Sequence, residues 1–188
     1  SLSTHSLSIF GDHQDIYAVR QTGACMLSSS SVEEAYHMAM VSHLASIKSS
    51  LPFINFFDGF RTSHEIDKVK EIDLSKLETL IDKKALRKFR DNGMISGATT
   101  RGTAENEDVY FQHTESRNGY YTKAIDNVIY YMDKINKICK TDYKPFNYYG
   151  DKSSDTVIIA MGSVCECIKE VVDDLNKKGK KVGLVTVH

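Results

Sequence analysis

Short apolar runs alternate with longer amphipathic stretches along the first third of the chain. Residues 7–10 alternate in polarity and stop at a Gly-Asp pair, while residues 23–27 and 53–57 form compact apolar runs. Runs of this length between turn residues are typical of β-strands, and the compact ones are typical of buried strands. The pattern therefore predicts three strands in this part of the chain.

A helical period separates the two compact runs and covers residues 32–48. Ser31 and Glu34 have capping-box spacing, in which the serine side chain accepts a backbone N–H and the glutamate reaches back to another. The strand–helix–strand order predicts a parallel pair with a right-handed crossover. The apolar stripe of this helix is expected to consist of Val32, Ala35, Tyr36, Ala39 and Met40.

The middle of the chain is more polar. Residues 68–90 are charged and helix-prone, with an apolar face formed by Leu74, Leu77, Leu80 and Ile81. Residues 91–118 contain several Gly and Thr with weak periodicity, so we expect a loop and connector there. Residues 118–140 regain a helical period, and residues 142–154 are expected to lead into a second domain.

The last segment has the clearest local pattern. Residues 157–161 read as a buried strand, Gly162 as a turn, and Ser163 with Glu166 as a second capping box. The helix is expected to run to residue 178 and to end at Gly179 in the left-handed conformation, with a strand over residues 181–188. Two strands and one helix cannot bury both faces of a parallel sheet, so the second domain is expected to be incomplete.

Composition and charge narrow the class of protein. With 41% hydrophobic and 26% charged residues, the chain fits a soluble globular protein. The net charge of −1 gives no field that attracts nucleic acid, and no apolar run is long enough for a membrane span, so neither is an expected partner. The first residue is Ser1 and no signal region follows it, which fits an internal start and equally an engineered or processed end.

Cysteine and histidine patterns give no metal site. Cys165 and Cys167 are two residues apart on a predicted helix, which turns them about 200° away from each other. His64-Glu65 begins like a zinc-protease helix, but position 68 is Lys68 and not histidine. All four cysteines are expected to be free, buried thiols in a reducing, cytosol-like compartment, and we expect no residue of this chain to bind a metal or cofactor.

The candidate site is the stretch from Asp58 to Glu65, just beyond the carboxyl end of a predicted parallel strand. Open α/β sheets place their ligands at such ends. Arg61 can hold a carboxylate in a forked pair, and a histidine such as His64 titrates near neutrality. The alternative is that Asp58 and Arg61 brace a loop between domains or subunits, because residue density alone does not show a pocket.

Seven phrases, in order along nearly the whole chain, closely resemble pyruvate:ferredoxin (flavodoxin) oxidoreductases. The longest is PFINFFDGFRTSHEI at residues 52–66; the others lie at residues 7–13, 18–23, 101–106, 110–112, 146–150 and 161–166. The resemblance implies an α/β fold with two parts. Residues 1–117 would form the latter part of a pyrimidine-type, parallel-sheet thiamine-diphosphate domain with its connector. Residues 118–188 would form a linker helix and the first βαβ unit of a transketolase C-terminal-like domain.

The resemblance also implies a reaction. Members of that family oxidatively decarboxylate pyruvate with coenzyme A to acetyl-CoA and CO2, using thiamine diphosphate, Mg2+ and [4Fe-4S] clusters. Electrons pass to ferredoxin or flavodoxin, or through a fused flavin domain to NADP. The activating glutamate, the metal–diphosphate motif and the cluster cysteines match no position of this chain, so the segment alone is expected to be inactive. Asp58, Arg61 and His64 are therefore only site-adjacent candidates.

Two functional classes are open at this point. The first is a fragment of the oxidoreductase, homodimeric in full-length form and located in the cytoplasm, with a hydrogenosome or similar organelle as the alternative. The second is a structural and dimerisation module of a homologue that lacks pyruvate chemistry.

Overall fold

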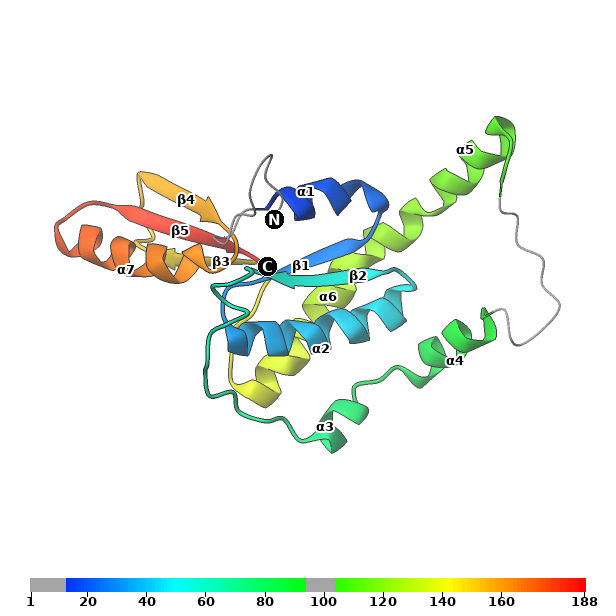
Figure 1. Cartoon of the computed structure of the whole chain (residues 1–188), viewed down its shortest axis with the longest axis horizontal. Coiled ribbons are helices and arrows are strands. Elements are labelled where there is room, and N and C mark those ends of the chain that lie inside the picture. The colour runs from blue at the N-terminus through cyan, green and yellow to red at the C-terminus, as the bar shows by residue number, and fades with distance from the viewer. Residues whose placement is uncertain (1–12, 94–103) are drawn as a thin grey trace.

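A computed structural model of the chain describes residues 13–93 and 104–188, and it contains two small sheets flanked by helices (Figure 1). The first sheet has two strands, β1 and β2, and the second has three in the order β3-β5-β4. In chain order the elements are α1 (Gln14–Val19), η1 (Arg20–Thr22), β1 (Cys25–Ser29), α2 (Val32–Ser49), β2 (Phe53–Phe57), α3 (Leu74–Glu78), α4 (Lys83–Asp91), α5 (Glu107–Ser116), α6 (Asn118–Cys139), β3 (Phe146–Gly150), β4 (Thr156–Ala160), α7 (Val164–Lys177) and β5 (Val182–Val187).

The first βαβ unit confirms the prediction. Strands β1 and β2 pair in parallel, with Cys25 opposite Phe53 and Ser29 opposite Phe57, and α2 forms the crossover. The Ser31 side chain accepts the backbone N–H of Glu34 at 3.2 Å, as the capping-box spacing predicts. The strand expected over residues 7–10 lies outside the described residues.

Helix α2 buries a different face from the one predicted. Ala39 is exposed and the rest of the predicted stripe is only half-buried, whereas Met38, Val41 and Ala45 are fully buried. The buried face also carries Glu34 and His37, whose polar groups are hydrogen-bonded in the structure. The sequence pattern missed this face because a buried charged residue is rare unless it is paired.

The first core lies between α2 and α6. Tyr131, Met132 and Ile135 of α6 are fully buried against α2, with Leu80 and Ile81 packed around them. Helix α6 thus confirms the helical period of residues 118–140, although Ile125 is 63% exposed.

The polar middle of the chain departs from the prediction in one place. The stretch expected to be helix-prone, residues 68–90, holds the short helix α3 and most of α4. Residues 107–116 form α5, which was expected to be a loop and which continues almost directly into α6 (Figure 1). The apolar side chains of α5 are exposed (Val109, Tyr110 and Phe111), so the sequence shows no amphipathic pattern that would predict this helix. The acidic residues of its first turn, Glu107 and Asp108, were the sequence feature that could have indicated it.

The second sheet is mixed. Strands β4 and β5 pair in parallel as predicted, but β4 is not buried as expected, since Val157 and Ile159 are exposed. Strand β3, which was not predicted, pairs antiparallel with β5. Helix α7 lies along one face of this sheet, where Cys165, Val172 and Leu184 form a second core (Figure 1). Gly179 has a φ of +78°, the left-handed conformation expected at the end of α7. Within the described residues, no helix is both long and apolar enough to span a membrane.

Candidate functional site

The two sheets meet through residues that follow their parallel strands. Ser30 follows β1, Asp58 follows β2, Ser163 lies just beyond β4, and His188 follows β5. Figure 1 shows these strand ends converging near the middle of the molecule. We call the contact region formed by Ser30, Glu34, Asp58, Ser163, Glu166 and His188 the inter-sheet seam. Open α/β sheets place functional groups at the carboxyl ends of their strands, so the seam is the natural place to look for a site.

Asp58 is the centre of the first seam contact. Its Oδ2 accepts the backbone N–H of Ser163 at 2.7 Å and also the Ser163 hydroxyl, and Nε2 of His13 lies 3.3 Å from its Oδ1. Burial raises the pKa of this carboxyl, but the hydrogen bonds from Ser163 and the His13 contact outweigh burial, so the net pKa lies below the ordinary value. Asp58 is therefore held as an anion, which suits a bracing role better than a proton-accepting one.

The capping box predicted at Ser163 and Glu166 does not form. Ser163 occupies the N-cap position of α7, but its backbone is helical and its side chain makes no cap hydrogen bond. The hydroxyl turns to Asp58 instead, because a charged acceptor forms a stronger hydrogen bond than a neutral one.

Gly162 permits the close approach of Asp58. Its φ is +79°, and a Cβ at this position would lie 2.9 Å from Oδ2 of Asp58. Only glycine adopts this conformation without strain and leaves room for the carboxylate.

Glu34 forms the second seam contact. Its Oε1 lies 2.8 Å from Nε2 of His188, and its Oε2 accepts the backbone N–H of Ser30, one residue before the capping-box position. Glu34 is only 8% exposed, and burial raises its pKa, but His188 and Ser30 outweigh burial and the net pKa is lowered. Glu34 thus reaches back as the capping-box spacing predicts, but to Ser30 and not to Ser31, and it also joins α2 to the end of β5.

Smaller contacts extend the seam on both sides. The Ser30 hydroxyl donates to Oε1 of Glu166 at 3.1 Å, which links β1 to the first turn of α7. The Tyr143 ring lies between His37 and His188, with its hydroxyl 2.9 Å from Nδ1 of His37. The seam is therefore a hydrogen-bonded network and not a single contact.

A cavity of about 340 Å³ opens beside the first seam contact. Its walls include His13, Asp58, Arg61, Ser163 and Cys167. The structure thus brings Asp58 and Arg61 to one cavity, and their role in a site stays a prediction. A guanidinium at a cavity wall can hold a carboxylate or another anion.

His64 is not part of this cavity. It is exposed, its Nδ1 lies 2.9 Å from the Ser63 hydroxyl, and its ring lies 5.3 Å from that of Phe60. His13, which does line the cavity, was not singled out from the sequence. Its place in the LSIFGDH phrase was the only available signal, because nothing in local periodicity pairs it with a residue 45 positions away.

The described residues form no metal centre. Within residues 13–93 and 104–188, no group of three His, Cys, Asp or Glu residues is placed to hold a cation. Cys165 is buried, but Cys167 is exposed, so the expectation that all four thiols are buried is wrong for Cys167. A magnesium–diphosphate pair needs several oxygen ligands together, so no residue described here is assigned to that cofactor.

Fold and seam together define a two-unit α/β scaffold in which two sheets are joined at their strand ends. Residues 1–133 match the family described as "Pyruvate flavodoxin/ferredoxin oxidoreductase, thiamine diP-bdg", and residues 154–188 match "Pyruvate:ferredoxin oxidoreductase core domain II". The chain belongs to the pyruvate flavodoxin/ferredoxin oxidoreductase family. Its first unit, with the parallel β1–β2 pair, is of the thiamine-diphosphate-binding type.

Relatives from bacteria and a protist match the entire chain. It is 51% identical to the pyruvate-flavodoxin oxidoreductase of Enterobacter agglomerans and 46% identical to the pyruvate:ferredoxin oxidoreductase of Moorella thermoacetica, and covers 16% of each. It is 44% identical to the mitochondrial NADP(+) pyruvate dehydrogenase of Euglena gracilis and covers 10% of it. The chain thus corresponds to a small part of enzymes that differ in their electron acceptors.

Proposed function

We propose that this chain is the junction between two domains of a 2-oxo acid oxidoreductase. The complete enzyme converts pyruvate and coenzyme A to acetyl-CoA and CO2, releasing one proton and two electrons. The electrons pass to ferredoxin or flavodoxin, or through a fused flavin domain to NADP. The observation that supports this reaction is the similarity along the whole chain to pyruvate oxidoreductases of both acceptor types.

The chain's own contribution in this proposal is structural and positional. The seam fixes the end of β2 against the start of α7 through Asp58 and Ser163, so that the wall carrying Arg61 has a defined position. Thiamine diphosphate, when bound, supplies the carbanion chemistry at the keto carbon. That cofactor, Mg2+ and the [4Fe-4S] clusters are held by other parts of the enzyme.

The domain division at residues 117 and 118 remains a prediction. Helix α6, which begins at Asn118, packs into the first core against α2, while Asn136 near its end accepts the backbone N–H of Tyr143, which leads toward the second sheet. These two contacts support the proposal that α6 links the two units. A homodimeric enzyme in the cytoplasm, or in a hydrogenosome-like organelle, is part of the same proposal.

The test is pyruvate- and coenzyme-A-dependent reduction of methyl viologen by the full-length protein that contains this chain. We expect reduction that requires both substrates. Absence of reduction in a folded protein loaded with cofactor and clusters would overturn the proposed reaction.

A second candidate function is a structural module of a homologue without pyruvate chemistry. The observation that favours it is that Asp58 is engaged in bracing contacts with Ser163 and His13. Light scattering separates the candidates when it is combined with the viologen assay. A dimer without activity supports the module, and activity supports the oxidoreductase.

A further inference from the structure

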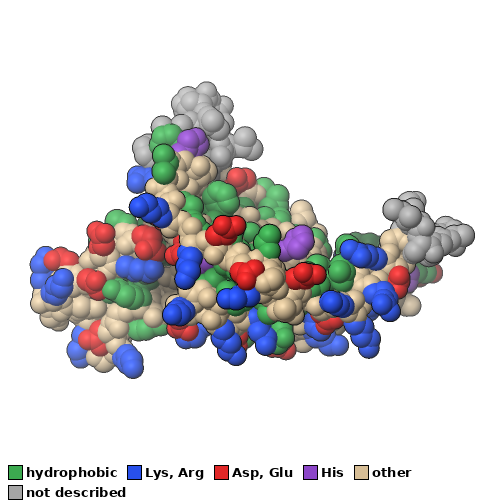
Figure 2. Space-filling model, turned by 90° about the horizontal axis from the view of Figure 1, so that it is seen from below, with side chains coloured by type: hydrophobic (Ala, Val, Ile, Leu, Met, Phe, Trp, Pro, Cys, Tyr) green, Lys and Arg blue, Asp and Glu red, His purple; other side chains and the backbone are tan. Residues whose placement is uncertain are grey.

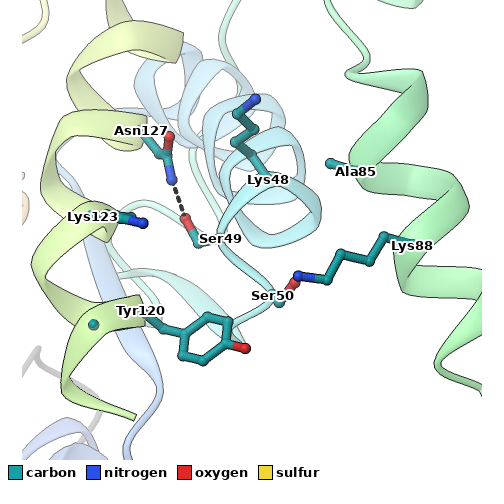
Figure 3. A pocket seen from close by; sticks show the side chains of 9 residues that line it. Lys48, Ser49, Ser50, Ala85, Lys88, Tyr120, Lys123 and Asn127 are labelled. Atoms are coloured by element: carbon teal, nitrogen blue, oxygen red, sulfur yellow. Dashed lines mark hydrogen bonds between the residues drawn. The ribbon is translucent and has the colours of Figure 1, made fainter. Parts of the chain in front are cut away.

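A second cavity, which shares no lining residue with the inter-sheet seam, lies between the end of α2, helix α4 and the start of α6 (Figure 3). Its volume is about 370 Å³. Three lysines line it, one from each helix: Lys48, Lys88 and Lys123. No aspartate or glutamate is among its lining residues.

The purely basic lining of this cavity is a local feature of the molecule. The whole chain has 24 basic and 25 acidic residues, and the face shown in Figure 2 has side chains of both signs interspersed. Lys48 forms an ion pair with Asp82 at the rim. Lys88 and Lys123 form no ion pair with any carboxylate in the described part of the chain, so their charge is available to a ligand.

The neutral walls complete the cavity. Asn127 donates to the Ser49 hydroxyl at 2.9 Å, which ties α6 to the end of α2 and sets the spacing of the two helices. In Figure 3 the Tyr120 hydroxyl and the Lys88 ammonium point toward the space between α6 and α4, from opposite sides. Tyr120 is 45% exposed, so its ring and hydroxyl are accessible to a bound molecule.

Two ammonium groups on separate helices, without an arginine fork, favour one kind of anion. Lysine binds phosphate as a point charge, whereas planar recognition of a carboxylate favours arginine. A diphosphate spreads two or more negative charges over a length that can contact both walls at once. We propose that this cavity binds a polyphosphate anion, either free inorganic diphosphate or the diphosphate of a nucleotide whose base lies against Tyr120.

The experiment uses the full-length protein, saturated with thiamine diphosphate and freed of excess cofactor, so that the cofactor site does not compete. Inorganic diphosphate and ADP are titrated separately by calorimetry at low salt. The test variant is Lys88→Gln with Lys123→Gln. The control variant, Lys177→Gln with Lys180→Gln, removes the same charge from exposed positions at the end of α7.

We expect saturable binding that weakens at least about tenfold in the test variant, since two charge-assisted contacts are lost, and hardly changes in the control. Tighter binding of ADP, reduced by Tyr120→Leu, identifies the nucleotide as the source of the diphosphate; equal binding of both probes identifies the free anion. Absence of saturable binding to the unmodified protein, or equal weakening in test and control variants, would overturn the proposal. The titrations contain neither pyruvate nor coenzyme A, so a failure of binding here is distinguishable from a failure of the proposed reaction.

Discussion

Asp58 and Ser163 are 105 residues apart in the chain, yet the carboxylate of one accepts both the backbone N–H and the hydroxyl of the other. The contact joins the end of β2 to the start of α7, and therefore joins the two sheets. Asp58 lies in the segment matched by the first family description, and Ser163 lies in the segment matched by the second. The contact therefore joins the two family segments directly.

The hydroxyl contribution can be measured by Ser163→Ala. We expect a loss of about 1–3 kcal/mol in the free energy of unfolding, because a hydrogen bond to a charged, largely buried acceptor is removed. The matched control is Ser153→Ala, which removes a hydroxyl whose hydrogen bond to Asp151 is exposed to solvent and should cost less. Denaturant unfolding followed by circular dichroism provides both values, and equal losses would show that burial of Asp58 adds nothing.

Gly162→Ala tests the close approach to Asp58. The alanine would be strained at a φ of +79°, and its Cβ would displace the carboxylate. We expect a cost of about 2–4 kcal/mol, against about 1 kcal/mol for Gly179→Ala, which has nearly the same φ but no atom within 4 Å. The comparison isolates the steric contribution, and similar costs for both variants would contradict it.

Much of the fold followed from the sequence because β1, α2, β2 and β4 carry local signals. Strand β3 was missed because its pairing with β5 is long-range and its side chains are mostly exposed. The buried face of α2 was missed because Glu34 and His37 interrupt it, and their partners lie at His188 and Tyr143, more than 100 positions away.

The candidate site was predictable only in part. Asp58 and Arg61 were identified because they follow a parallel strand, and the structure places both at one cavity. His64 follows the same strand but is exposed, since the turn after Gly59 directs it away. The hydrogen bond between Ser163 and Asp58 could not be predicted from local sequence. Ser163 has the same capping-box spacing as Ser31, but only the Ser31 side chain forms the cap.

Stability should depend on pH through Glu34. Its pKa is lower in the folded protein than the ordinary value of 4.5, so its contribution is present above that value and is lost as the pH falls through the folded-state pKa. We expect Glu34→Gln to cost about 2 kcal/mol at pH 7 and to flatten the decline of stability below pH 4.5. Unfolding curves between pH 7 and pH 3 measure both effects. The exposed Glu170→Gln is the control, and an identical profile for both variants would refute the assignment.

Thiol labelling should separate the two neighbouring cysteines of α7. Cys167 is exposed, whereas Cys165 is fully buried and burial raises the pKa of its thiol. We expect iodoacetamide to modify Cys167 well before Cys165 in the folded chain, and at similar rates after denaturation. Peptide mass spectrometry at successive times measures the modification of each cysteine. Modification of Cys165 before Cys167 would contradict the orientation of α7, because it would mean that the opposite face of the helix packs on the sheet.

The central claim is that this chain supplies the junction of the scaffold while other parts of the enzyme hold the reactive cofactor. Calorimetric titration with thiamine diphosphate and Mg2+ tests this claim. It is done on the full-length protein and on the isolated 188-residue chain, once circular dichroism has shown that the isolated chain is folded. The account predicts saturable binding to the full-length protein and none to the isolated chain. Saturable binding of the cofactor to the isolated chain would contradict it.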